Sequence, residues 1–210
     1  MAINKGYLTC DRSSNGDEVI TPRYAVEPLI KYLKINNCKK IWCPFDKEHS
    51  QYTRVLRANG FEVIATGGCD FFMIPKLNCD CIVSNPPFSK KDEILKKCYE
   101  MGISFALLLP QNSLQSKERT KMFIEKGLEY LGFDSRICFY TRSKVKIEDE
   151  WIYKWTPEDL KEIKVGNHFA SGYFCWKLLP KELIFEKLEL IQEPYCENYT
   201  EMAEELNKGE

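Results

Sequence analysis

The chain has 210 residues, 44% of them hydrophobic and 13% aromatic, which suits one packed domain with at most a modest appendage. Its 30 basic and 31 acidic residues give a net charge of -1, so a strongly basic field over the whole molecule is excluded. No apolar run approaches the length of a membrane span or the pattern of a secretory signal, so we expect a cytoplasmic protein without membrane contact.

The first elements of the chain are a polar segment and a helix. Residues 1–20 are polar and include the loop signal Ser13-Ser14-Asn15-Gly16, so we expect a flexible N-terminal segment. Thr21-Pro22 then predicts a helix start, with threonine as the cap and proline in the first turn. Apolar residues at helical spacing extend this helix to about Asn36.

Short apolar strands then alternate with amphipathic helices. The predicted strands are residues 40–43, 61–66, 79–84, 104–109 and 128–133, and the predicted helices between them are 51–59, 91–100 and 116–126. This alternation is typical of parallel βαβ units and predicts an α/β fold with a doubly wound, mostly parallel sheet. Ligands of such sheets bind at the carboxyl ends of the strands.

The pattern changes in the C-terminal third of the chain. Residues 144–167 form a charged stretch with Trp151, Tyr153 and Trp155, and an apolar strand is predicted over 169–179. We interpret 144–167 as an insertion in an antiparallel strand pair near the C-terminus. Its aromatic residues fit a recognition element and the packing of a hairpin or dimer contact equally well. Residues 181–210 are expected to be an acidic tail, so the main domain would span 21–180.

The cysteine and histidine residues do not indicate a metal site. The ten cysteines include no CxxC pair and several fall inside strand-like runs, so we expect free thiols in a reducing compartment. His49 and His168 are isolated in the sequence, and single histidines are more often structural than catalytic.

The run Asn85-Pro86-Pro87-Phe88 directly follows the predicted strand 79–84 and suits chemistry on a planar amine. Such an amine is a poor nucleophile because its lone pair is delocalised into the ring. The Asn85 side-chain oxygen and the Pro86 carbonyl could accept its two hydrogens and localise the lone pair. Both prolines lack an N–H group, which leaves carbonyls free at the strand end, and Phe88 offers a face for stacking. The alternative is a strand that simply ends in a Pro-Pro loop, but the position at a sheet end favours the chemical interpretation.

With these residues the chain resembles the S-adenosylmethionine-dependent amino-methyltransferases, and most of all the small bacteriophage-type DNA N6-adenine methyltransferases with an Asn-Pro-Pro-Phe motif. The resemblance covers residues 19 to 180. The positions that carry it are Thr21-Pro22-Arg23-Tyr24, Pro44-Phe45, Asp70-Phe71-Phe72, Asn85-Pro86-Pro87-Phe88, Leu107-Leu108-Leu109-Pro110, Arg136 with Phe139, and Gly166-Asn167 with Phe169-Ala170-Ser171.

The resemblance implies a Rossmann-like methyltransferase fold, S-adenosylmethionine as cofactor, and adenine-containing DNA as the partner, with RNA and a second copy of the chain as further candidates. It implies a catalytic clamp for the target base made of Asn85, Pro86, Pro87 and Phe88. It also implies two groups of cofactor-binding residues. Thr21, Pro22, Pro44, Phe45 and Asp46 would surround the methionine end, and Asp70, Phe71 and Phe72 would hold the adenine end.

Two segments depart from the family pattern. The loop Cys43–Ser50 has cysteine where the family has an acid, and it lacks the glycines that let backbone approach the cofactor. Thr66-Gly67-Gly68 stands where an acid usually holds the ribose, and Asp46 or Glu48 could supply the missing carboxylate. Alternative functions are methylation of an RNA base (guanine N2 or adenine N6), methylation of a protein glutamine, and binding of nucleic acid or cofactor by a catalytically degenerate module.

Overall fold

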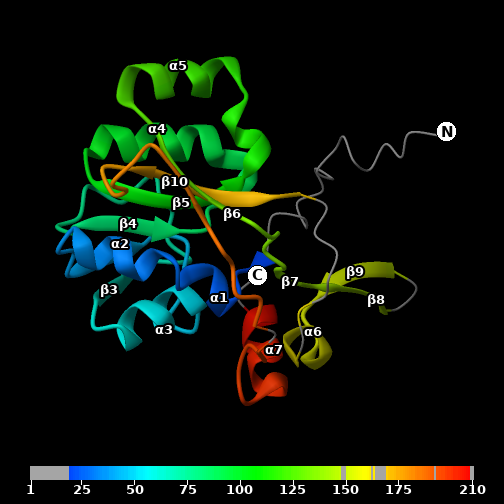
Figure 1. Cartoon of the computed structure of the whole chain (residues 1–210). Coiled ribbons are helices and arrows are strands. Elements are labelled where there is room, and N and C mark those ends of the chain that lie inside the picture. The colour runs from blue at the N-terminus through cyan, green and yellow to red at the C-terminus, as the bar shows by residue number, and fades with distance from the viewer. Residues whose placement is uncertain (1–18, 148–149, 162, 164–168, 192, 209–210) are drawn as a thin grey trace.

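A seven-stranded sheet lies at the centre of the molecule between two layers of helices (Figure 1). The structure is a computed structural model, and it describes residues 19–147, 150–161, 163, 169–191 and 193–208. In spatial order the strands are β11 (Leu183–Glu186), β6 (Glu129–Phe133), β10 (Ser171–Trp176), β5 (Ser104–Pro110), β4 (Cys81–Ser84), β2 (Lys40–Cys43) and β3 (Glu62–Ala65).

All strands of this sheet are parallel except β10, which pairs antiparallel with both β5 and β6. The chain passes from β2 to β3 on one side and then returns to β4 on the other side of β2. The prediction of a doubly wound, mostly parallel α/β sheet with an antiparallel strand near the C-terminus is therefore confirmed.

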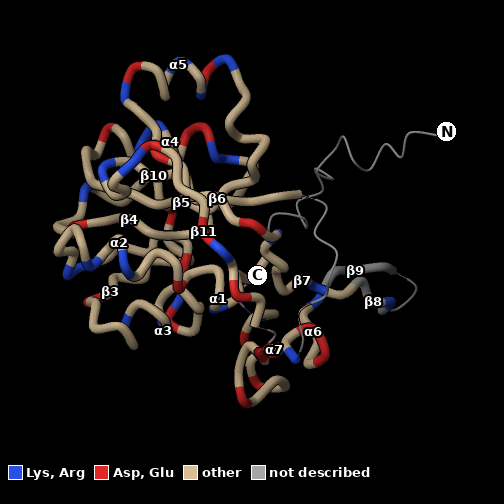
Figure 2. The backbone as a smooth tube through the Cα atoms, in the orientation of Figure 1, with Lys and Arg blue, Asp and Glu red and all other residues tan. Residues whose placement is uncertain are grey.

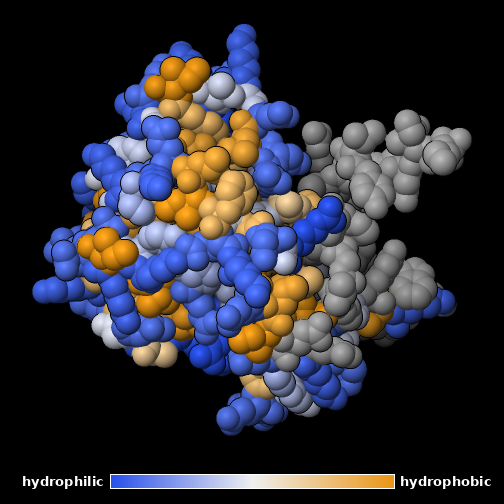
Figure 3. All heavy atoms as spheres, viewed as in Figure 1, coloured by the Kyte–Doolittle hydropathy of each residue, from blue (hydrophilic) through white to orange (hydrophobic). Residues whose placement is uncertain are grey.

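Helices cover both faces of the sheet because its strands carry apolar side chains in both directions. One face packs against α1 (Arg23–Val26), α2 (Leu29–Ile35) and α3 (Gln51–Ala58), and the other against α4 (Lys91–Met101) and α5 (Lys117–Lys126). Lysine residues lie among acidic residues on α4 and α5 (Figure 2), in keeping with the small net charge. On the face seen in Figure 3, apolar side chains gather between α5 and the centre of the sheet.

The first predicted helix is divided into α1 and α2. Pro28 stands between them because proline lacks the N–H that would continue the helical ladder. The N-cap of α1 is Pro22, which makes no side-chain capping bond, whereas Thr21 was expected to be the cap. Val19–Ile20 forms the short strand β1, which pairs with β7 (Tyr140–Thr141). The expected flexible segment 1–20 otherwise lies outside the described residues.

The insertion 144–167 forms a hairpin and a short helix. Strands β8 (Ser143–Ile147) and β9 (Glu150–Lys154) pair antiparallel and project from the body of the molecule, and α6 (Pro157–Lys161) follows them (Figure 1). Residues 166–168, which include part of the family resemblance and one histidine, lie outside the described residues.

The segment after residue 180 contributes to the fold, in contrast to the acidic tail expected there. Strand β11 pairs in parallel with β6 and extends the sheet. Helix α7 (Tyr199–Lys208) packs on α6, and Asn207 exchanges two hydrogen bonds of 3.0 Å with the backbone of Trp155. Within the part of the chain that the structure describes, none of the helices has both the length and the apolar character needed to span a membrane.

Candidate active site

The candidate site lies where the order of the parallel strands reverses. Strand β2 has β3 on one side and β4 on the other, and a crevice forms at the carboxyl ends of strands at such a switch point. A cavity of about 330 Å³ opens there, within the size range of small-molecule sites. Six of the predicted site residues line it: Thr21, Pro44, Phe45, Asp46, Asn85 and Pro87.

Asp46 places a buried carboxylate in this cavity. It lies three residues beyond β2, and its Oδ2 accepts a short hydrogen bond from the hydroxyl of Ser84, the last residue of β4. Burial raises the pKa of Asp46 to about 6, although hydrogen bonds from Ser84 and Ser50 oppose the rise. A buried carboxylate whose partners in the described part of the chain are hydroxyl groups favours a ligand that brings a positive charge or N–H donors.

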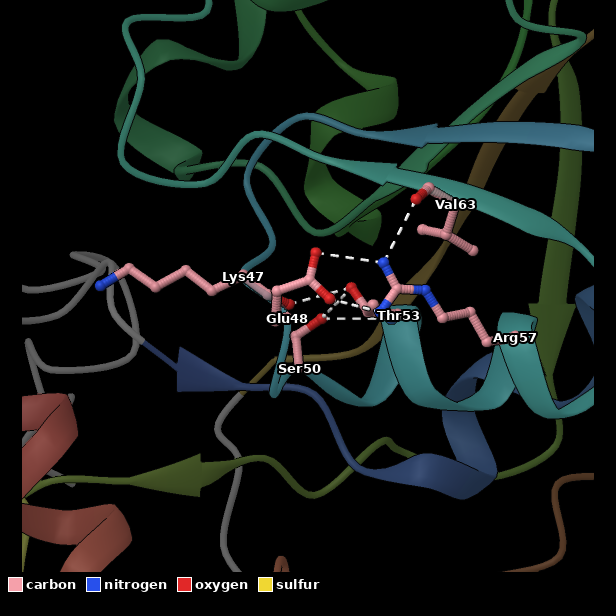
Figure 4. A network of polar contacts seen from close by, with 6 residues as sticks. All are labelled: Lys47, Glu48, Ser50, Thr53, Arg57 and Val63. Atoms are coloured by element: carbon pink, nitrogen blue, oxygen red, sulfur yellow. Dashed lines mark hydrogen bonds and ion pairs between the residues drawn. The ribbon is translucent and has the colours of Figure 1, made fainter.

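The other acid considered for this role, Glu48, points away from the cavity. Figure 4 shows its carboxylate paired with the guanidinium of Arg57 on α3, which also donates to the carbonyl of Val63 at 3.4 Å. The Ser50 hydroxyl accepts from the Thr53 N–H at 3.3 Å and so caps α3. These contacts fix the loop after β2 from its outer side, so Asp46 is the acid that faces the cavity.

Gly67 brings two backbone segments together beside Asp46. Its N–H donates to the Asp46 carbonyl at 2.9 Å, and a Cβ at this position would lie 2.6 Å from the Asp46 carbonyl carbon. Only glycine permits this approach without displacing the loop. Gly68 follows with a φ of +99° and lines the cavity. The glycines that the loop 43–50 lacks thus stand just after the end of β3, where Gly68 faces the cavity.

A chain of hydroxyl groups orients the Asn85 side chain. Asn85 Nδ2 donates to Thr21 Oγ1 at 3.1 Å, and Thr21 in turn hydrogen-bonds Tyr52. The Tyr52 and Tyr173 hydroxyls are 3.0 Å apart, and Tyr173 donates to the Ala25 carbonyl at 2.9 Å. Because a carbonyl can only accept, the proton directions are set along the whole chain: Tyr52 donates to Tyr173 and Thr21 donates to Tyr52. Thr21 Oγ1 is therefore an acceptor toward Asn85, which must present its NH2 group there.

This orientation leaves the Asn85 side-chain oxygen without a partner. Asn85 Oδ1 is buried, and no residue that the structure describes donates a hydrogen bond to it. A buried acceptor without a donor is destabilising by about 1 to 3 kcal/mol, so such atoms commonly mark ligand positions. The atom that the sequence predicted as an acceptor for an amine hydrogen is thus held in place and unsatisfied.

The remaining motif residues surround Asn85. Pro86 is buried, Pro87 lines the cavity, and Phe88 begins a 3-10 turn over Phe88–Lys90. The Phe88 ring makes an edge contact with Phe169, with centroids 5.7 Å apart. Phe88 is partly exposed and does not line the cavity, so its stacking role stays a prediction.

The predicted adenine-binding residues lie beside the cavity and do not line it. Asp70 accepts from the N–H of Phe72 at 2.9 Å within a turn, and Phe71 is buried against Phe45 at a ring distance of 5.0 Å. Phe72 is 37% exposed. Lys97 of α4 donates to the carbonyls of Phe71 and Phe72 and secures the turn. Pro22 also lies outside the lining. The cofactor roles of these residues stay predictions.

The C-terminal segment supplies cavity residues that the sequence did not indicate. Tyr195 and Leu206 line the cavity together with Trp155 of the insertion. His49 lines it as well, and its Nδ1 lies 3.3 Å from a carboxylate oxygen of Glu205. Burial lowers the pKa of His49, which favours the neutral ring at pH 7. Tyr195 and Leu206 lie far along the chain from the motif at Asn85, and no local pattern identifies them.

No metal centre is formed among the residues that the structure describes. No group of histidine, cysteine, aspartate and glutamate side chains in the described ranges could hold an ion, and the described cysteines are free.

Comparison with known proteins gives distant structural likenesses. No family model matches the chain, and no curated protein matches it. The chain is similar to a crystal structure from Listeria monocytogenes that is provisionally described as a class I S-adenosylmethionine-dependent methyltransferase. The two share 12% identity with a TM-score of 0.39, and the match covers 80% of this chain and 65% of that one.

Proposed function

We propose that the chain is an S-adenosylmethionine-dependent methyltransferase that acts on the exocyclic N6 amine of adenine in DNA. The observation that supports this most is the state of Asn85. Its NH2 group is held by Thr21, and its buried Oδ1 has no donor among the described residues. An amine hydrogen is the partner that this acceptor lacks.

The cavity residues fit S-adenosylmethionine. The cofactor carries an ammonium and a sulfonium group, and the buried Asp46 carboxylate is the group in the cavity that would offset a positive charge. Gly68 lines the cavity, and a glycine there lets backbone approach a ligand closely. Thr21 and Pro44, which are predicted to surround the methionine end, line the same cavity. When bound, the cofactor would supply an electrophilic methyl group.

The clamp would act on the amine in two ways. Asn85 Oδ1 accepts one amine hydrogen and the Pro86 carbonyl accepts the other, which draws the lone pair out of conjugation. As the new N–C bond forms, both acceptors stabilise the positive charge that develops on nitrogen. The extra proton becomes acidic once the methyl group has been transferred and then leaves to water. A strong base is not needed, because the proton is acidic by the time it leaves.

Methyl transfer from labelled S-adenosylmethionine to single-stranded DNA, duplex DNA, RNA and protein tests this proposal. We expect label in adenine-containing DNA, recovered as N6-methyladenine after digestion. The Asn85→Ala variant should lose about 100-fold or more in kcat, by analogy with the loss of one charge-stabilising group in other enzymes, with nearly unchanged cofactor affinity. Asn78→Ala is the matched control, because Asn78 is exposed and lies three residues before the start of the strand that Asn85 follows.

Three outcomes would contradict the proposal. Label found in RNA or protein but not in DNA would contradict the proposed substrate and leave the proposed cofactor in place. Equal losses of kcat and cofactor affinity in Asn85→Ala would remove Asn85 from the clamp. No transfer together with no cofactor binding, measured by calorimetry, would refute the enzyme assignment.

A further inference from the structure

A second cavity lies at the same edge of the sheet as the candidate active site. It has a volume of about 180 Å³ and forms where β5 and β6 end and β10 begins. Its lining includes Gln111, Gly132, Asp134, Arg136, Ala170 and Phe185. None of these residues takes part in the proposed clamp or in the cofactor cavity.

The second cavity is joined to the clamp through adjacent residues. The Phe88 ring contacts the Phe169 ring at 5.7 Å, and Ala170, the next residue, lines the second cavity. The Gln111 N–H donates to the Ala170 carbonyl at 2.8 Å, which fixes the end of β5 against this segment. A ligand that extends from the clamp along the sheet edge therefore reaches the second cavity next.

The lining of the second cavity suits a neutral, planar, polar ring. Phe185 is 64% exposed, and its ring lies over Gly132, where a Cβ would come within 2.6 Å of it. Gln111 offers an amide that can donate and accept together, which is the pattern used to read a base edge. Asp134 and Arg136 are both exposed and carry opposite charges, so the cavity does not favour a phosphate. Its volume lies below the range of whole-ligand sites and suits a part of a larger ligand.

We propose that this second cavity binds the base of a nucleotide that neighbours the target adenine in the same strand. Phe185 provides the stacking surface, and Gln111 contacts the edge of the base. The inference rests on the proposed function, because it assigns a second contact to the same nucleic-acid substrate.

A scan with abasic nucleotides tests the assignment. Single-stranded oligonucleotides with one adenine would carry an abasic site moved stepwise through the flanking positions. Binding would be followed by fluorescence anisotropy and methyl transfer by initial rates. We expect one flanking position at which base removal weakens binding by the wild-type protein about five-fold or more, the lower range for loss of one stacked base.

Two pairs of variants identify the residues involved. Phe185→Ala should bind the intact oligonucleotide about five-fold or more weakly and show no further loss with the abasic site at that position. Leu183→Ala is the control, because Leu183 is 58% exposed on the same strand and face but does not line the cavity. Gln111→Ala should reduce the preference among bases at that position, whereas Asn112→Ala should not.

Failure of this inference can be told apart from failure of the proposed function. Methyl transfer to DNA with equal effects at all flanking positions, or equal binding by Phe185→Ala and Leu183→Ala, would overturn the inference alone. Absence of methyl transfer and of oligonucleotide binding by the wild-type protein would overturn the proposed function and this inference with it.

Discussion

Replacing Asp46 by asparagine should raise the free energy of unfolding of the protein without ligand. The same substitution should lower its affinity for the cofactor. Burial raises the pKa of Asp46 from the ordinary 3.8 to about 6. At about 1.4 kcal/mol for each pH unit, this difference means that the charged carboxylate destabilises the folded state by about 3 kcal/mol at neutral pH. Asparagine keeps an oxygen that can accept from Ser84 but carries no charge.

The direction of the pKa shift determines how the stability difference between Asp46→Asn and the wild-type protein changes with pH. The folded-state pKa of Asp46 lies above the unfolded-state value, so the fold favours the protonated carboxyl group. Its contribution to stability is present below about pH 4 and is lost as the pH rises through about 6. In urea unfolding without ligand, Asp46→Asn should match the wild-type protein near pH 4 and exceed its free energy of unfolding by up to about 3 kcal/mol above pH 7.

Asp80→Asn is a control with the opposite sign. Asp80 accepts hydrogen bonds from the N–H groups of Lys39 and Lys40 at 2.7 and 2.8 Å, which lower its pKa. Its contribution is present at neutral pH and lost as the pH falls, so Asp80→Asn should be less stable than the wild-type protein at pH 7. A pH-independent difference in stability between Asp46→Asn and the wild-type protein would refute the reasoning. Equal stabilisation of Asp46→Asn and the wild-type protein by S-adenosylmethionine at pH 7.5 would refute it as well.

Two further substitutions test the hydroxyl chain and the backbone contact. Tyr173→Phe should reduce stability by about 1 to 2 kcal/mol and also lower kcat for methyl transfer, because the orientation of Asn85 is lost. Tyr99→Phe removes a comparable hydrogen bond to Gly127, of 2.7 Å, and should lower stability alone. Gly67→Ala should weaken cofactor binding in calorimetry as well as lower the melting temperature, because the new methyl group meets the Asp46 carbonyl. Gly60→Ala, at a φ of +90° with open space around it, should affect only the melting temperature, and equal cofactor binding by both glycine variants would contradict the assignment.

Much of the sheet could be predicted because its strands are buried apolar runs bounded by clear breaks. The predicted strand 40–43 is observed as Lys40–Cys43, and the strand predicted at 104–109 is longer by one residue. The helix predicted over 116–126 begins one residue later, at Lys117. The candidate site followed from the same reasoning, since a motif after a central parallel strand must lie at a carboxyl edge.

The C-terminal segment could not be predicted in the same way. Strand β11 is an edge strand in which Leu183 and Phe185 remain exposed, so it lacks the buried alternation that marks a strand in a sequence. Tyr195 is buried, yet it stands in a polar stretch between Pro194 and Cys196. Its burial depends on long-range bonds, including one of 2.9 Å from its hydroxyl to the His49 carbonyl. A tertiary contact of this kind leaves no local pattern.

For the predicted cofactor loop, the local sequence and the three-dimensional structure lead to different expectations about ligand binding. Read along the chain, Cys43–Ser50 lacks both an acid at the expected place and the expected glycines. In the structure, Asp46 supplies a buried carboxylate three residues later, and Gly67 supplies the close backbone approach from the neighbouring strand. Asp46 lines the same cavity as Asn85, as does Gly68 next to Gly67, and Ser84 joins Asp46 to the strand that precedes the clamp. We therefore expect the two departures to compensate each other, because a ligand responds to where charge and backbone lie in space and not to which segment provides them.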